Sequence, residues 1–125
     1  MNKDIQERTF DFSVRIVNLS AELPDSKAAK VLGNQVLRSG TSIGANVEEA
    51  SSAYTKDVFA YKINIALSEA RETHYWLRLL VASEIVSEPR LQDLIDEANQ
   101  LVAILTTIIK KTRQNKEGTR VKSER

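Results

Sequence analysis

Hydrophobic residues recur at helical spacing in four segments of the chain, and short polar stretches separate these segments. The first segment runs from Ile5 to Leu23, and Pro24 directly after it predicts the end of a helix. One face of this helix carries Phe12, Ile16, Leu19 and Leu23, at steps of four, three and four. This spacing places apolar side chains on a single side of a helix. Asp25 or Ser26 is expected to cap the helix that follows.

The second segment, from Ser26 to Tyr54, carries two neighbouring stripes. The first stripe holds Leu32, Val36, Ile43, Val47, Ala50 and Tyr54. The second holds Gly33, Leu37, Gly40 and Gly44. Glycine in a helix interior costs about 1 kcal/mol relative to alanine, so three glycines on one face predict that another element packs closely there. The alternative is that Gly40 marks a break between two shorter helices.

The third and fourth segments predict two more helices. The third runs from Lys56 to Ser83, with Thr55 or Asp57 as its N-cap. Its inward stripe comprises Phe59, Ile63, Ala66, Ala70, Leu77, Leu80 and Val81, with Thr73 in the gap. The fourth runs from Pro89 to Thr112 behind a Ser87 cap, and its apolar positions follow a heptad-like pattern.

Long segments joined by short connections place sequence neighbours side by side and antiparallel. The predicted fold is therefore all-α, an antiparallel up-and-down four-helix bundle that spans residues 1–113. From Gln114 onward the apolar pattern stops. Residues 114–125 are predicted to form a basic, disordered C-terminal tail.

Composition narrows the function classes. The chain has 125 residues, which suits one domain. It contains no cysteine, which excludes disulfides, thiolate metal sites and a cysteine nucleophile. The N-terminus shows no secretory signal, and no apolar run approaches the roughly 20 residues that span a bilayer. We therefore expect a cytoplasmic protein without a membrane partner.

The net charge of +1 conceals an uneven distribution. Residues 1–109 hold 11 Lys and Arg against 15 Asp and Glu, which gives −4, while residues 110–125 hold 7 against 2, which gives +5. The basic positions proposed for nucleic-acid binding are Lys110, Lys111, Arg113, Lys116, Arg120 and Lys122. Such a run can bind phosphates with counterion release, although no aromatic residue is interleaved for base stacking. The alternative is a solubilising tail whose cations complement the dipole of a helix C-terminus.

Residues 37–50, the signature segment, carry a recognisable pattern. It begins with a leucine, Arg38 and a pair of small residues, Ser39 and Gly40. A six-residue core follows, which comprises Thr41, Ser42, Ile43, Gly44, Ala45 and Asn46. An acidic residue comes shortly after this core. The segment resembles the signature of the bacterial four-helix bundle proteins, also called 23S rRNA intervening-sequence proteins. Residues 66–70, with Glu69, resemble the third helix of that family.

The resemblance implies an up-and-down bundle that assembles as a homopentameric ring and has no established enzyme activity. A relative serves as an accessory subunit of the reverse transcriptase of diversity-generating retroelements, and it binds nucleic acid through a basic surface. The resemblance thereby implies RNA or DNA, and the other subunits of the ring, as partners.

Few residues offer chemistry. Glu48 and Glu49 are adjacent on a helix and diverge, and the single histidine, His74, cannot supply a multi-histidine metal site. We expect no enzyme activity, no cofactor and no metal. Asn46 could bond across helices, with Glu69 facing it from the third helix; a polar network that specifies the fold is favoured over a ligand pocket. Trp76 lies either at a subunit interface or at the margin of the core.

The predicted function is therefore a non-enzymatic, oligomeric scaffold or adaptor that binds nucleic acid electrostatically. The alternative is a protein-protein interaction module in which the glycine face of the second helix takes up a partner helix and nucleic acid plays no part.

Overall fold

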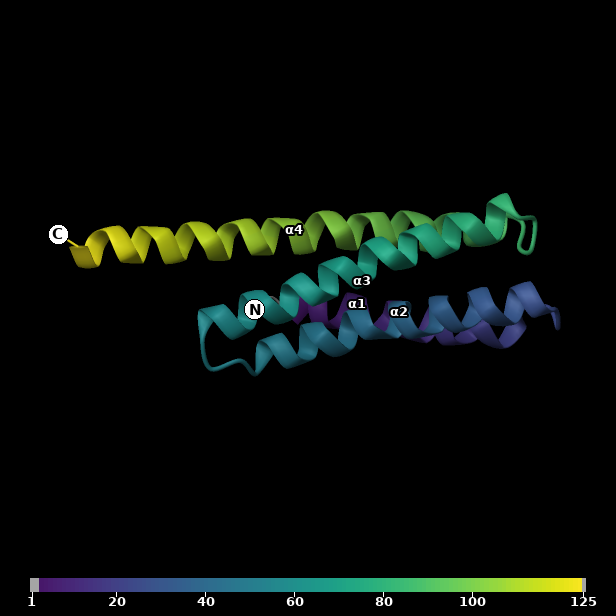
Figure 1. The fold of residues 1–125 in the computed structure, drawn as a ribbon, viewed down its shortest axis with the longest axis horizontal. Helices are drawn as coiled ribbons and strands as arrows, with labels where there is room; N and C mark the ends of the chain where they lie inside the picture. Colours follow the sequence, from purple (N-terminus) through teal and green to yellow (C-terminus); the bar gives the residue numbers. More distant parts are fainter. Residues whose placement is uncertain (1–2, 125) are drawn as a thin grey trace.

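The computed structural model describes the backbone of residues 3–124 and the side chains of residues 4–115. Four α-helices make up this part of the chain: α1 (Lys3–Glu22), α2 (Lys27–Ser51), α3 (Lys56–Ala82) and α4 (Glu88–Glu124). Figure 1 shows α1 and α2 lying side by side, α3 crossing between α2 and α4, and α4 extending beyond the other helices at its C-terminal end.

Consecutive helices pack on each other, α1 on α2, α2 on α3 and α3 on α4. Contacts between α1 and α4 are much sparser, and the backbones of α1 and α3 do not come close to each other. The fold is all-α, and its sequential packing agrees with the predicted up-and-down bundle. Across the sparse side, Arg8 of α1 pairs with Glu97 of α4, and Glu22 pairs with Arg90.

The core is built from the predicted stripes. Its fully buried large side chains include Phe12, Ile16, Val36, Ile43, Val47, Ile63, Leu77, Leu80, Leu91, Leu101 and Leu105. Burial of each such side chain contributes about 1.5–3 kcal/mol relative to leaving it exposed. Two predicted N-caps are confirmed, because Ser26 accepts a hydrogen bond from the amide of Ala29 and Thr55 accepts one from the amide of Val58.

Two predictions about helix limits differ from the structure, and one alternative is excluded. The alternative of a break at Gly40 is wrong, since α2 is continuous from Lys27 to Ser51. Tyr54 was predicted in the inward stripe, but α2 ends before it and its side chain is fully exposed in the loop. Helix α4 passes the predicted end at Thr112 and continues to Glu124. Lys, Arg, Gln and Glu are good helix formers and no proline intervenes, so the packed helix can propagate into the basic segment.

Candidate functional site

The signature segment forms the C-terminal half of α2, where this helix packs on α1 on one side and on α3 on the other. A Cβ atom placed on Gly40 would lie 2.8 Å from Cγ1 of Ile16, and one placed on Gly44 would lie 3.1 Å from the carbonyl oxygen of Thr9. Both distances are shorter than ordinary contacts, so the two glycines allow α1 to approach closely. The predicted close packing is confirmed. The hypothesis that a partner helix docks on this glycine face is wrong, because α1 of the same chain covers it.

The opposite side of the signature segment meets α3 through a buried polar contact. The hydroxyl oxygen of Thr73 lies 2.9 Å from Oγ of Ser39 and 2.8 Å from the carbonyl oxygen of Glu69. Ser39 in turn donates to the carbonyl oxygen of Gln35 at 2.8 Å. Ser39 and Thr73 are both completely buried. Because each hydroxyl has a partner, this contact links α2 to α3 without leaving an unsatisfied polar group.

Nearer the solvent, Arg38 joins two carboxylates of α3. Its Nη1 lies 3.1 Å from Oε2 of Glu69, and its Nη2 contacts Glu72. The indole Nε1 of Trp76 donates to the same carboxylate of Glu72 at 3.2 Å. Half-exposed ion pairs of this kind contribute little to stability, at most about 1 kcal/mol. Trp76 is itself partly buried against the core, so this polar group lies at the margin between α2 and α3.

Asn46 does not make the predicted bond across helices. Its Nδ2 donates to the carbonyl oxygen of Ser42 at 2.9 Å and lies 3.1 Å from the Ser42 hydroxyl. Thr41 likewise bonds within α2, to the carbonyl oxygen of Leu37 at 2.7 Å. The expectation that Glu69 faces Asn46 is wrong, because Glu69 pairs with Arg38. The buried hydroxyl pair of Ser39 and Thr73 takes the place of the predicted cross-helix contact.

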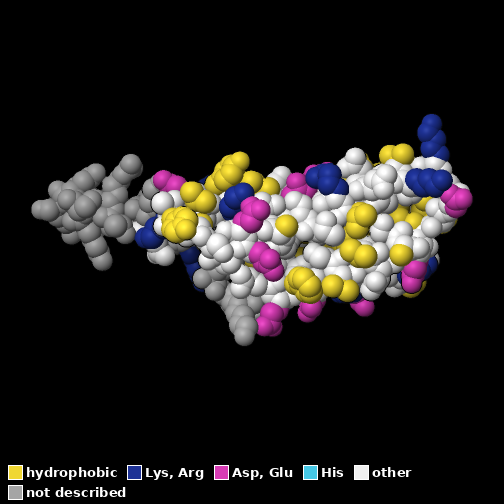
Figure 2. Space-filling view, turned by 90° about the horizontal axis from the view of Figure 1, so that it is seen from below, with side chains coloured by type: hydrophobic (Ala, Val, Ile, Leu, Met, Phe, Trp, Pro, Cys, Tyr) yellow, Lys and Arg dark blue, Asp and Glu magenta, His cyan; other side chains and the backbone are white. Residues whose placement is uncertain are grey.

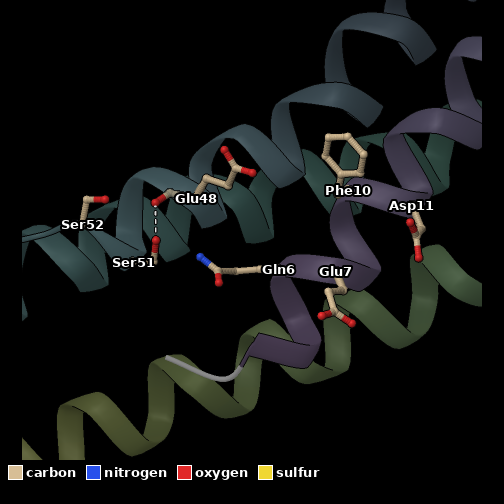
Figure 3. Close-up of a pocket in the computed structure, with 7 residues that line it drawn as sticks. All are labelled: Gln6, Glu7, Phe10, Asp11, Glu48, Ser51 and Ser52. Carbon is tan, nitrogen blue, oxygen red and sulfur yellow. Dashed lines mark hydrogen bonds between the residues drawn. The ribbon is translucent and has the colours of Figure 1, made fainter.

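The end of the bundle formed by the α1–α2 pair carries an open depression of about 540 Å³. Its lining comprises Gln6, Glu7, Phe10, Asp11, Glu48, Ser51 and Ser52. Figure 3 shows Gln6 pointing toward α2 while Glu7 points away from it, so the carboxylates do not converge. Ser51 donates its hydroxyl proton to the carbonyl oxygen of Glu48 at 2.6 Å. The arrangement offers no paired acid and base and no nucleophile with a base beside it.

The remaining titratable side chains of the described residues do not gather at one site either. Partial burial, together with the nearby charge of Arg78, lowers the pKa of His74 below its ordinary value. Within the described residues, no three His, Asp or Glu side chains cluster so that they could hold a metal ion. The same part of the chain contains no helix long and apolar enough to cross a membrane.

The basic segment follows the last core residue of α4. Lys110, Lys111 and Arg113 are exposed on this helix, just beyond the buried Ile109. Lys111 also lines a groove between α4 and the start of α1. The side chains of the other three predicted nucleic-acid ligands, Lys116, Arg120 and Lys122, lie outside the described residues, although the backbone there is helical.

The structure also exposes apolar surface that the sequence reasoning missed. On α1, Phe10, Val14 and Val17 are 59%, 46% and 49% exposed. Their spacing of four and three is present in the sequence. The sequence analysis assigned only the inward stripe of the same helix, which has more apolar positions. On α3, Tyr61 and Tyr75 are also exposed. Figure 2 shows hydrophobic side chains lying open between acidic and basic ones on the face that it presents.

The chain is thus a helical bundle protein of four sequentially packed helices, in which glycines of α2 let α1 approach closely. Its candidate functional residues lie on the surface. The family model for the 23S rRNA-intervening sequence protein matches residues 1–107. The chain therefore belongs to the 23S rRNA-intervening sequence protein family, which confirms the resemblance drawn from the signature segment.

A solved structure supports the same assignment. The chain is similar to a protein of unknown function from the S23 ribosomal protein family of Bacteroides thetaiotaomicron, with 40% sequence identity and a TM-score of 0.80. The match covers 85% of this chain and 98% of that one. No curated protein matches the chain. The comparisons thus establish the family and the fold.

Proposed function

We propose that the protein is a cytoplasmic, non-enzymatic scaffold that assembles into a homo-oligomeric ring and binds nucleic acid through the basic end of α4. The family resemblance favours five copies. The observation that carries the nucleic-acid part of the proposal is the position of the cations. Lys110, Lys111 and Arg113 are exposed on α4 where it leaves the bundle, and the body before them has a net charge of −4.

This distribution suits electrostatic binding without sequence preference. A rigid helix that carries several cations presents them at fixed spacing to a phosphate backbone, and each phosphate neutralised releases counterions. In an assembly, several such helices would act together and raise the overall affinity through multivalency. No aromatic residue is interleaved with Lys110, Lys111 and Arg113 along α4, so the proposed binding rests on electrostatic attraction and not on base stacking.

The test compares the wild-type protein with a variant that carries Lys110→Gln, Lys111→Gln and Arg113→Gln. Binding of a labelled, structured RNA would be followed by fluorescence anisotropy over a series of salt concentrations. Losing up to three phosphate contacts per protomer should weaken binding and reduce the slope of log affinity against log salt by about 2 to 3.

A matched control replaces three exposed cations away from the end of α4, through Arg15→Gln, Lys27→Gln and Lys30→Gln. This control has the same net charge as the test variant, so a general charge effect would weaken both equally. Equal affinity of the wild-type protein and the test variant would remove the end of α4 from the proposal. Binding that does not depend on salt would exclude the electrostatic mechanism.

A further inference from the structure

Helix α1 is apolar on two opposite sides. Its inner side is buried in the core, while Phe10, Val14 and Val17 form a continuous stripe on the outer side at steps of four and three. A bundle helix that faces only water on its outer side normally carries polar residues there. This stripe, together with the acidic residues around it, is named the α1 patch. It comprises Phe10, Val14 and Val17, bordered by Glu7, Asp11 and Glu48.

Helix α3 carries a second surface with the opposite charge, in which Tyr61 and Tyr75 are exposed and Trp76 is partly buried against the core. Tyr75 and Trp76 contact each other edge to face at 5.0 Å, and the guanidinium of Arg78 lies 6.0 Å from the centre of the Tyr75 ring. Arg71 is exposed one helical turn before Tyr75. Tyr61 extends the same face toward the start of the helix, and it is 64% exposed. This α3 patch comprises Tyr61, Tyr75 and Trp76, bordered by Arg71 and Arg78.

The charged borders of the two patches are unneutralised within the protomer. Among residues 4–115, the three carboxylates that border the α1 patch form no ion pair, and neither do the two guanidinium groups that border the α3 patch. Figure 3 shows Glu7, Asp11 and Glu48 arranged around Phe10. The α1 patch is thus an apolar surface with an acidic border, and the α3 patch is an aromatic surface with a basic border.

The two patches are both exposed in the protomer, and α1 and α3 are not neighbouring helices, so the patches do not cover each other within one chain. We propose that the α1 patch of one copy packs on the α3 patch of the next copy, an inference that rests on the proposed oligomeric scaffold and names its contact. Charge selects this pairing. Two α1 patches would bring carboxylates together and two α3 patches would bring guanidinium groups together, whereas α1 against α3 places opposite charges side by side.

The proposed contact has a consequence for symmetry. Two different patches on each copy make a head-to-tail interface, which closes into a ring when the rotation between copies allows it. A contact of one patch with its own copy would instead produce a two-fold dimer. The proposal therefore accounts for a ring by the placement of side chains on α1 and α3.

The experiment uses two single variants, Phe10→Asp in the α1 patch and Tyr75→Asp in the α3 patch. Sedimentation velocity and light scattering should give the wild-type protein a mass that is a multiple of 14.0 kDa. Each variant alone should sediment as a single protomer. A 1:1 mixture should form a dimer and nothing larger, because Phe10→Asp keeps an intact α3 patch and Tyr75→Asp keeps an intact α1 patch.

Val31→Asp is the matched control, since Val31 is 54% exposed on α2 and belongs to neither patch. It should keep the wild-type mass. Circular dichroism checks that all variants stay helical. If Phe10→Asp fails to fold, the exposed pair Glu7→Lys and Asp11→Lys replaces it; this pair should dissociate the assembly, and adding Arg71→Glu and Arg78→Glu to the same chain should restore it.

The outcomes separate the two proposals. A wild-type protein that is monomeric would overturn both the oligomeric scaffold and the contact. A wild-type oligomer that keeps its mass in both single variants would overturn the contact alone. A variant that forms two-fold dimers by itself would show that a patch pairs with its own copy, which also contradicts the head-to-tail contact.

Discussion

Gly40→Ala tests the packing that the signature segment creates between α1 and α2. The new Cβ atom would lie 2.8 Å from Cγ1 and 2.9 Å from Cγ2 of Ile16, and 3.3 Å from its Cβ. Ile16 is completely buried, and the contacted atoms belong to the stiff, branched part of its side chain. The clash therefore cannot be relieved by a simple rotation of a chain end, so α1 or the Ile16 side chain must shift.

Two opposing effects set the magnitude. Alanine is favoured over glycine in a helix interior by about 1 kcal/mol. Overpacking a well-packed core costs about 1–3 kcal/mol. The net effect of Gly40→Ala should be a loss of about 0.5–2 kcal/mol in the free energy of unfolding, because the clash is with a buried side chain that has little room to move.

Gly33→Ala is the matched control within the same stripe. Its new Cβ atom would lie 2.8 Å from Cδ1 of Leu23, which is the far end of a flexible, partly buried side chain near the end of α1. Leu23 can move aside at little cost, so the helix propensity of alanine should dominate. We expect Gly33→Ala to be neutral or to stabilise the protein by up to about 1 kcal/mol.

Urea unfolding followed by circular dichroism at one fixed protein concentration gives both values, since the stability of an assembly depends on concentration. Adding Ile16→Val to Gly40→Ala removes one contacting methyl group, and the double variant should be more stable than the sum of the single changes predicts. A Gly40→Ala protein as stable as the wild type would refute the reasoning, because it would show that the contact between α1 and α2 can accommodate the added methyl group.

Two further predictions concern polar groups of α3. Thr73→Val removes the hydroxyl that lies 2.9 Å from Ser39, keeps the side-chain volume and should cost about 1 kcal/mol, measured by urea unfolding. Combining Thr73→Val with Ser39→Ala should cost less than the sum of the two single changes; full additivity would show that the two hydroxyls do not interact. The pKa of His74 is lowered in the folded state, so the folded protein binds this proton more weakly than the unfolded chain does. The contribution of neutral His74 to the free energy of unfolding is therefore fully present above the unfolded pKa of 6.5, and it is lost as pH falls through the folded pKa. The wild-type protein should therefore lose more stability between pH 7.5 and pH 5 than His74→Gln does; parallel pH profiles would contradict this.

The inward faces of the helices were predictable because burial imposes a strict spacing. Ile16, Ile43 and Leu77 all occupy core positions that their three- and four-residue steps indicate. Capping was equally readable, since a serine or threonine just before an apolar-periodic run satisfies free amides at a helix start. Tyr54 does not follow this rule. Its spacing continued the α2 stripe, but a helix end depends on local capping geometry that periodicity alone does not report.

Partners of polar side chains were not predictable in the same way. Asn46 was placed near a packed face, yet its amide bonds back to the carbonyl group of its own helix. Whether a polar group bonds locally or across helices depends on the rotation of each helix about its axis and on side-chain rotamers, which a single sequence does not fix. The outer stripe of α1 could be predicted from the spacing of Phe10, Val14 and Val17. That this stripe stays exposed could not be predicted, because it depends on where the other helices pack.

The residues that identify the family are the ones least able to explain its function. Gly40 and Gly44 bring α1 close, Ser39 meets α3, Ile43 fills the core, and Arg38 is engaged by carboxylates of the same chain. Each of these residues takes part in packing or bonding within the chain, so the signature specifies the bundle. The surfaces that we propose for partner binding lie elsewhere, on the outer sides of α1 and α3 and at the end of α4. Family members that share the signature but differ at these outer positions should therefore share the fold and differ in what they bind.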